Sequence, residues 1–432
     1  MLVVRDCALR PPVFCPEWPW KKFATRLPPL FGGLILPGGG KGFCNLKPNM
    51  HYRTITHAQL PDYATSEAYR RSAVWPTSPA RAESYRHNPY ASPEHPALFL
   101  ALDDSDNLRG FLGTLPDRWQ LQGRTLTIAW LSCLWVDPAC RGQGIAGALL
   151  RQAHEAWEGM LALTEFTPAA KALYDRSGLF VLLPARTGWR AYRRPDVQGT
   201  VLRRWPKLQP IAPVLRGLDA LGEGLLSLSD HPAPLPDSGS ISLGGTLFEP
   251  WQQEALSTET GLHQALDKRV QDDPLSPTLS LILSRLQWIH EHPWLKQAAP
   301  DDGARRYPFS SVSAQFQTWL WLVKHIDGEF AGVVSMSLRD GVLKIPYCLV
   351  PDSALTDVLM LARSLMNKHE AHTLVTHQQK LVNMLHQNRK GFVHLRPSTR
   401  YYMLSKGLAA HWDAAQADIA LAQDGAGDAA FT

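Results

Sequence analysis

The stretch that decides the fold is Leu134-Trp135-Val136-Asp137-Pro138-Ala139-Cys140-Arg141-Gly142-Gln143-Gly144-Ile145-Ala146-Gly147-Ala148-Leu149-Leu150. A strand-like apolar run stops at Pro138, a turn containing Gly142 and Gly144 follows, and a helical pattern then begins. The start of a helix leaves about four backbone N–H groups without internal partners, at the positive end of the helix dipole. Because glycine lets a ligand approach the backbone closely, the stretch predicts a phosphate-binding turn.

Two nucleotide-binding motifs are excluded for this turn, and one purely structural explanation stays open. The turn matches neither G-x-G-x-x-G after a first strand nor G-x-x-x-x-G-K-[ST]. Another glycine run, at 38–42, also fails the second motif, because Gly42 stands where Ser or Thr must ligate magnesium and Ile35 replaces the first glycine. The structural explanation is a tight turn in which the small residues 146–148 let the helix lie close to the sheet.

The composition indicates a soluble globular protein of two or three domains, with 432 residues, 45% hydrophobic and 19% charged. No apolar run approaches the ~20 residues of a membrane span, and no secretory leader is recognisable, so we expect a cytoplasmic protein. The net charge of +5 arises within residues 1–49, which hold seven Lys or Arg and two Asp or Glu. The rest is neutral, which gives no reason to expect a nucleic-acid partner. The six cysteines show no metal-binding spacing, so we expect no metal.

Alternating strand-like and helical runs predict a mixed α/β (α+β) fold, with a mostly antiparallel central sheet flanked by helices. After a helical stretch (57–71) and a Pro-rich excursion (75–96), the expected elements of the first unit are strands 98–103, 110–115 and 126–136, helix 142–158, strand 160–164, helix 168–177 and a final pair at 179–194. The expected elements of a second unit are strands 319–326, 330–338 and 342–350, helix 354–368, strand 372–375, helix 378–388 and a pair at 392–404.

The two series of elements indicate a duplication. Val136-Asp137-Pro138 precedes Val350-Pro351-Asp352 by about 214 residues, and Ser177-Gly178-Leu179 precedes Lys390-Gly391-Phe392 by about 213. We therefore expect units at 50–195 and 246–408. The remaining segments are expected to be a disordered or loosely packed extension (1–49), a linker region with a short helix near 213–227 (196–245) and a C-terminal tail (409–432).

Two motifs of the first unit resemble those of the GCN5-related N-acetyltransferase (GNAT) superfamily. Arg141-Gly142-Gln143-Gly144-Ile145-Ala146, after Val136-Asp137-Pro138, resembles the family signature R-x-x-G-x-A. The run from Thr167 to Leu179 resembles the late-helix pattern N-x-x-A-x-x-L-Y-x-x-x-G-F, with Thr in place of Asn and Leu in place of Phe. The resemblance covers roughly 140 residues, from 52 to 194, and the order of elements agrees with the family fold.

The resemblance implies direct transfer of an acyl group, most simply acetyl from acetyl-CoA, to a primary amine of a small-molecule or amino-sugar acceptor. The co-substrate would be held by the following residues: Leu134, Trp135, Val136, Arg141, Gly142, Gln143, Gly144, Ile145, Ala146 and Thr167. Thr167 can still cap its helix, although an amide contact to the co-substrate would be lost.

Tyr174 matches the family's acid on the thiolate side, whereas a packed helical Tyr is the structural alternative. The strand 126–136 has no carboxylate, so the base is less well defined; Glu165 is the candidate, and a surface Glu or a water chain without a dedicated base are the alternatives. His154 is expected on the outer face of its helix.

The second unit lacks the predicted chemistry. Residues 351–356 contain neither glycine nor arginine, and Gln387 stands where Tyr174 is expected. We expect this degenerate copy to wall off the substrate or stabilise the first unit. Alternatives for the whole chain are a non-catalytic CoA-binding scaffold, or an acyltransferase that uses a protein amine or a longer acyl donor.

Overall fold

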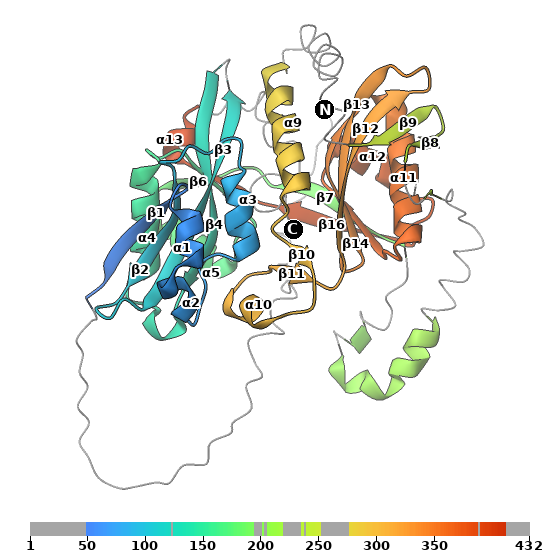
Figure 1. Cartoon of the computed structure of the whole chain (residues 1–432). Helices are drawn as coiled ribbons and strands as arrows, with labels where there is room; N and C mark the ends of the chain where they lie inside the picture. The colour runs from blue at the N-terminus through green and yellow to red at the C-terminus, as the bar shows by residue number, and fades with distance from the viewer. Residues whose placement is uncertain are drawn as a thin grey trace, which may run out of the picture. The chain divides into compact units, whose positions relative to one another are not determined.

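The computed structural model describes residues 49–121, 124–193, 201–202, 205–218, 235–236, 239–251, 276–387 and 389–411. Two large, mostly antiparallel sheets with helices packed on them make up this part of the chain (Figure 1). The predicted α/β (α+β) class with two such units is therefore confirmed. The predicted extension and tail lie almost wholly outside the described residues, as does part of the short helix expected near 213–227.

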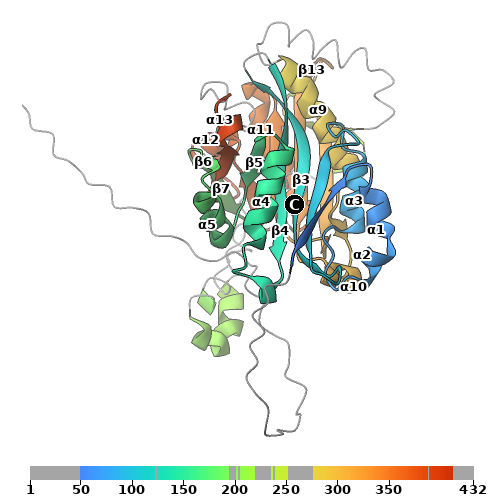
Figure 2. The same ribbon diagram turned by 90° about the vertical axis from the view of Figure 1, so that its left-hand side faces the viewer.

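The first sheet is antiparallel except where β4 pairs with β5. In spatial order its strands are β1 (His51–Thr56), β2 (Pro96–Leu102), β3 (Leu108–Leu121), β4 (Arg124–Val136), β5 (Leu161–Thr164), β17 (Tyr402–Ser405) and β6 (Phe180–Leu182). One face packs against α4 (Ile145–Ala156) and α5 (Pro168–Ser177). The other face packs against the group formed by α1 (Leu60–Thr65), α2 (Glu67–Arg71) and α3 (Pro79–Arg86). Figure 2 shows the two groups of helices on opposite faces of the sheet. Ser66 ends α1 and caps α2, so the predicted helix 57–71 is two short helices.

The second sheet repeats this order of elements. Its strands, in spatial order, are β16 (His394–Arg400), β7 (Arg186–Tyr192), β15 (Thr373–Thr376), β14 (Val342–Leu349), β13 (Phe330–Arg339), β12 (Phe316–His325), β9 (Thr246–Pro250) and β8 (Ile241–Leu243). Its apolar face lies under α11 (Leu355–Lys368) and α12 (Gln379–Gln387). Strands β8 and β9 are not predicted by the sequence pattern, because they are short and flank a Gly-Gly turn.

The two sheets exchange strands. The sequence predicts a closing strand pair at 179–194 and another at 392–404, and all four strands form. However, β6 joins the first sheet while β7 inserts between β15 and β16 of the second. Conversely, β16 joins the second sheet while β17 inserts between β5 and β6 of the first. Propensity and alternation define a strand but not its partner, so the sequence could not predict this exchange.

The remaining elements lie between and beside the sheets. They are η2 (Pro138–Cys140), η3 (Pro206–Ile211), α9 (Ser276–Glu291), β10 (Lys296–Gln297), α10 (Asp302–Arg306), β11 (Val312–Ser313), η5 (Asp352–Ala354) and α13 (Lys406–Ala409). Helix α9 contacts β3 of the first sheet and β12 of the second (Figure 1).

A buried ion pair joins α9 to β3. The Arg285 guanidinium pairs with the Asp117 carboxylate, and both side chains are less than a tenth exposed. Asp117 also accepts the indole N–H of Trp130 at 2.8 Å and that of Trp119 at 3.3 Å. Burial opposes the charge on Arg285, but Asp117, Tyr347 and Tyr90 together outweigh burial and raise the pKa of Arg285 above its usual value. The two halves are thus joined through a desolvated charge pair.

We expect Asp117→Ala to lower the free energy of unfolding by about 3–5 kcal/mol, because it leaves Arg285 buried without its carboxylate. Urea unfolding followed by tryptophan fluorescence measures the change. The control Asp117→Leu with Arg285→Met removes both charges and should recover much of the loss. A loss below about 1 kcal/mol for Asp117→Ala would show that the pair is not held as described.

Candidate functional site

The glycine-rich turn leads directly into α4 and is exposed to solvent. Gly142 and Gly144 have φ of 81° and 85°, in the left-handed region that glycine adopts without strain. A Cβ added at either would meet no atom within 4 Å, so these glycines serve backbone conformation and approach to the backbone. Gly144 is the N-cap of α4, and the N–H of Ala148 donates to its carbonyl at 3.0 Å. The helix thus starts at Ile145, three residues after the predicted start, and the N–H groups before Ala148 are those without helical partners.

The close approach of α4 to the sheet depends on a different residue from those predicted. Residues 146–148 are only half-buried, whereas α4 buries Ile145, Leu149, Leu150 and Ala153 at helical spacing. Gly110 of β3 makes the contact possible, because a Cβ there would lie 2.9 Å from Cγ2 of Ile145. The glycine that brings helix and sheet together is therefore on the strand.

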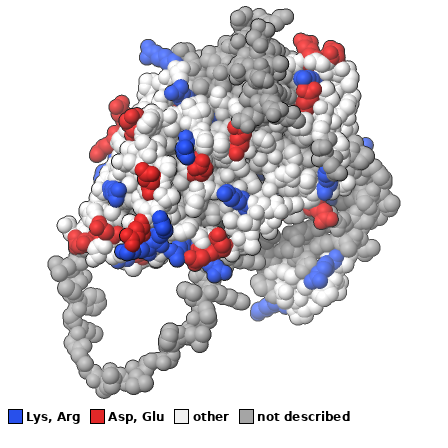
Figure 3. Space-filling model, in the orientation of Figure 1, with Lys and Arg blue, Asp and Glu red and all other residues white. Residues whose placement is uncertain are grey.

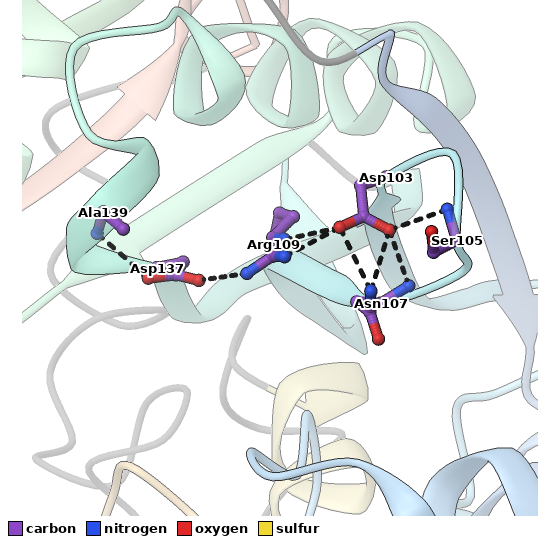
Figure 4. A network of polar contacts seen from close by, with 6 residues as sticks. All are labelled: Asp103, Ser105, Asn107, Arg109, Asp137 and Ala139. Atoms are coloured by element: carbon purple, nitrogen blue, oxygen red, sulfur yellow. Dashed lines mark hydrogen bonds and ion pairs between the residues drawn. The ribbon is translucent and has the colours of Figure 1, made fainter. Parts of the chain in front are cut away.

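A polar network holds the turn from the β2–β3 hairpin (Figure 4). Asp137 accepts the N–H of Ala139 at 2.9 Å and so caps η2, immediately before the glycines. Arg109 Nη1 lies 2.8 Å from the other oxygen of Asp137, and Arg109 Nε lies 2.8 Å from Asp103. Asp103 in turn accepts the N–H groups of Ser105 and Asn107 at 2.9 and 3.0 Å. In the sequence Asp137 stands out only as part of the Val136-Asp137-Pro138 motif, which does not predict this role.

Strand β4 is distorted where the predicted site lies. Phe111 pairs with Trp135 and Gly113 with Ser132, so Cys133 and Leu134 together oppose the single residue Leu112. This is a β-bulge, and Cys133 has φ of 53°. On the other edge, β4 pairs with β5 only at Ala129 and Trp130. Among the described residues the β4–β5 pairing ends at Trp130, and β5 continues to Thr164 along β17, so Leu134, Trp135 and Val136 form the strand edge that an extended ligand would meet.

Both halves of the chain hold this bulge. Arg81, on α3 and 6% exposed, donates from Nη2 to Ser132 Oγ and from Nη1 to Cys133 Sγ at 2.9 Å. From the second half, the Tyr307 hydroxyl accepts from Arg81 Nη1 at 3.2 Å. The ring of Trp294 lies 4.2 Å from the Arg81 guanidinium carbon. Arg81 could not be found from the sequence because its partners at the bulge and in the second half are 51 to 226 residues away in the chain.

The predicted acid, Tyr174, packs on the sheet where β4 and β5 diverge. It is 5% exposed and belongs to a core cluster that includes Leu131 of β4 and Leu163 of β5. Its ring meets Phe166 and Phe180 edge-on. Burial raises the pKa of the Tyr174 hydroxyl, which keeps it protonated.

The other predicted residues near β5 are Glu165 and Thr167. Glu165 follows β5 with φ of 53°, and its Oε1 lies 2.8 Å from Nη2 of Arg400. Thr167 caps α5 by accepting the N–H of Ala170 at 3.2 Å. His154 on α4 is half-buried rather than on the outer face.

The equivalent turn of the second half is closed. Ala354 ends η5 and is the N-cap of α11, which begins with Leu355, and these two residues are 1% and 5% exposed. Lys380 of α12 forms an ion pair with Asp352 at the start of η5. The buried start of α11 leaves a phosphate no room at the backbone, and the neighbouring cation, Lys380, is already paired with Asp352.

The family model of the acetyltransferase (GNAT) domain matches residues 94–178, which include the bulge, the glycine turn and Tyr174. These residues form a GNAT domain. The GNAT domain therefore contains the diverging strands and the exposed helix start described above. Among the described residues, no helix has the length and apolar character needed to cross a membrane.

The solved structures that match this chain have low sequence identity to it, and no curated protein matches it. A tandem GNAT protein from the clavulanic acid biosynthesis pathway is 13% identical, with 83% of this chain and 98% of that chain covered and a TM-score of 0.42. A GNAT from Kribbella flavida is 13% identical, with 83% and 72% covered and a TM-score of 0.39. The N-myristoyltransferase of Saccharomyces cerevisiae with myristoyl-CoA is 12% identical, with 89% and 91% covered and a TM-score of 0.41.

The Asp103 network predicts a pH-dependent stability. Burial favours the neutral carboxyl, but hydrogen bonds from Asn107, Arg109 and Ser105 outweigh it and lower the pKa of Asp103 from 3.8 to about 2. A depressed native pKa gives stability that is present above pH 3.8 and lost as the pH falls through about 2. We therefore expect Asp103→Asn to lower the unfolding temperature at pH 7, with the difference from wild type shrinking between pH 4 and 2. Calorimetry at each pH measures this, and a difference that stays constant at low pH would contradict it.

Proposed function

We propose that this protein is an acyl-CoA-dependent N-acyltransferase that transfers acetyl from acetyl-CoA to the primary amine of a small-molecule or amino-sugar acceptor. One observation carries the proposal: an exposed helix start with two left-handed glycines lies at the end of a strand whose edge is left open by the divergence of its neighbour. This combination offers an anion site and an extended backbone site in direct succession.

The GNAT-domain residues fit acetyl-CoA in two places. The pyrophosphate would lie on the backbone N–H groups of residues 141–146, where no Cβ of Gly142 or Gly144 intervenes. The pantetheine arm would add as a short strand to the edge formed by Leu134, Trp135 and Val136. The Arg109–Asp137 ion pair would hold the turn at a fixed distance from that edge.

The thioester of acetyl-CoA supplies a carbonyl that is already activated for attack. The side chains of this protein therefore need only assist the transfer of protons and stabilise the developing charge. The acceptor nitrogen attacks the carbonyl carbon, the C–N bond forms, and the C–S bond breaks. Tyr174, whose raised pKa keeps its hydroxyl protonated, would donate from that hydroxyl to the departing sulfur as negative charge develops there. The proton lost by the amine would go to Glu165 or to water. The bulge at Cys133 would present a backbone N–H to the carbonyl oxygen as negative charge develops there.

The second half would support this site rather than repeat it. Its closed turn argues against a second co-substrate site, while Tyr307 and Trp294 help to hold Arg81 against the bulge. The alternative of a non-catalytic scaffold differs in one measurable respect, because a scaffold would bind acetyl-CoA without releasing CoA in the presence of any amine.

We expect Gly144→Glu in the full chain to abolish acetyl-CoA binding, because it places a carboxylate against the pyrophosphate and a side chain at φ of 85°. Isothermal titration calorimetry measures the affinity. Gly147→Ala is the matched control, since its Cβ would meet only Arg151 at 3.6 Å. If Gly144→Glu binds acetyl-CoA with the wild-type affinity and molar ratio, the assignment of the turn is wrong. If it loses one site and still binds acetyl-CoA at another, the remaining site lies in the second half.

We expect wild type to release CoA in the presence of primary amines, and Tyr174→Phe to lower kcat by about 10²-fold, because the thiolate loses its acid. A thiol-release assay over amino sugars, polyamines, amino acids and peptides, with acetyl-CoA and longer acyl donors, measures both. The affinity for acetyl-CoA should stay near that of wild type, and Tyr401→Phe, at an exposed tyrosine, is the control. Wild-type turnover in Tyr174→Phe would remove this residue from the mechanism.

A further inference from the structure

Residues 205–218, which follow β7 in the chain, present large apolar side chains to solvent. Of the ten large hydrophobic residues that are exposed in the described part of the chain, five lie in this segment. Single exposed apolar side chains are ordinary, but their concentration in one place marks an interaction surface. The five residues, with exposed fractions between 37% and 65%, are Trp205, Leu208, Ile211, Val214 and Leu218.

Four of these side chains form one row because of the local helix geometry. In η3, side chains three positions apart eclipse one another, so Leu208 and Ile211 lie in line. The residues after η3 are α-helical, and Val214 and Leu218 follow Ile211 at steps of three and four positions, which are neighbours on a helix surface. Ala212, on another side of the same turn, is buried. The segment is therefore packed on one side and apolar on its exposed side.

Positive charge accompanies the apolar row. Lys207, directly before Leu208, is exposed, and Arg203 and Arg204 stand within four positions of it in the sequence. No Asp or Glu occurs from 197 to 218. Figure 3 accordingly shows blue and no red on the described part of this segment, at the lower right, whereas both colours are interspersed on the rest of the face shown. The segment thus complements a surface that is apolar inside and negatively charged outside.

Three features favour a lipid surface over a second copy of this chain. Two copies that met through this row would bring their Lys and Arg side chains together, and repulsion between like charges opposes such contact. Trp205, the exposed N-cap of η3, is of a residue type that concentrates at bilayer interfaces. Pro206, Pro210 and Pro213 have no backbone N–H, so they leave no donor unpaired where the segment enters an apolar layer.

We propose that residues 205–218 bind the surface of a lipid bilayer that contains anionic lipids. The apolar row from Leu208 to Leu218 would enter the boundary between headgroups and acyl chains, with the helical segment lying along the surface. Lys207 would place its ammonium group among the lipid phosphates and carboxylates, while its methylene chain lies on the apolar layer. Attachment of this kind is reversible, because it relies on partial insertion and charge attraction.

Sedimentation of the full chain with sucrose-loaded vesicles tests the proposal. We expect the chain to bind phosphatidylcholine vesicles that contain about one third phosphatidylserine at least about tenfold more tightly than vesicles of phosphatidylcholine alone. Raising the ionic strength from about 0.1 M to about 1 M should weaken this binding, because the Debye length falls from about 10 Å to about 3 Å. No binding to either kind of vesicle, or equal binding to both, would overturn the proposal.

Substitutions in the apolar row test whether this segment makes the contact. The double variant Ile211→Ser with Val214→Ser should bind the anionic vesicles about tenfold or more weakly, because the row loses its central apolar side chains. Ile326→Ser, at an exposed isoleucine between β12 and β13, is the matched control and should bind as wild type does. All these positions are exposed, so each variant should keep the wild-type unfolding temperature. Wild-type vesicle affinity in the double variant would sink the proposal.

A charge reversal tests the electrostatic part of the contact. Lys207→Glu should weaken binding to the anionic vesicles about tenfold, because it replaces attraction to the lipid headgroups by repulsion. Lys296→Glu, at an exposed lysine of β10, makes the same change of charge elsewhere and should leave the affinity unchanged. An equal loss in the two variants, or no loss in either, would contradict the proposal.

Association of the chain with itself would give a different result. Light scattering after size-exclusion chromatography, without lipid, should give wild type and the Ile211→Ser, Val214→Ser double variant the same oligomeric state. If wild type forms a dimer that the double substitution converts to a monomer, and neither binds vesicles, the row is an interface between copies and the proposal is wrong.

Discussion

Strands β7 and β17 cross in opposite directions between the two sheets, and the geometry of the site depends on this exchange. Strand β17 pairs with β5 on the edge opposite β4, and all four of its side chains are at most 1% exposed. The Ser405 hydroxyl accepts the N–H of Leu161 at 3.1 Å and donates to the carbonyl of Gly159. The strand that diverges from β4 is therefore fixed in place by the last strand of the other half.

The chemistry proposed for this protein needs little from side chains, so precise placement of the backbone matters most. Strand β4 is held at its end by the Arg109–Asp137 ion pair and at its bulge by Arg81. Tyr307 and Trp294 extend the second of these contacts into the second half. Such support limits movement of the bulge relative to the glycine turn, which is the condition for electrostatic stabilisation of a developing charge.

The two halves share an order of elements but have diverged in different directions. The first keeps an exposed helix start with left-handed glycines, whereas the second buries Ala354 and Leu355 at the corresponding position. Closing that turn removes an anion site at one end of the second sheet.

The sequence by itself determined the elements, the duplication and the glycine turn. Those features follow from local chemistry: hydrophobic period, glycine conformation and helix capping, as at Gly144 and Thr167. Only the tertiary structure decided which sheet each closing strand joins and which residues hold β4. Arg81 and Tyr307, or Glu165 and Arg400, are more than 220 residues apart in the chain, and their proximity arises from strand pairing that no local pattern encodes.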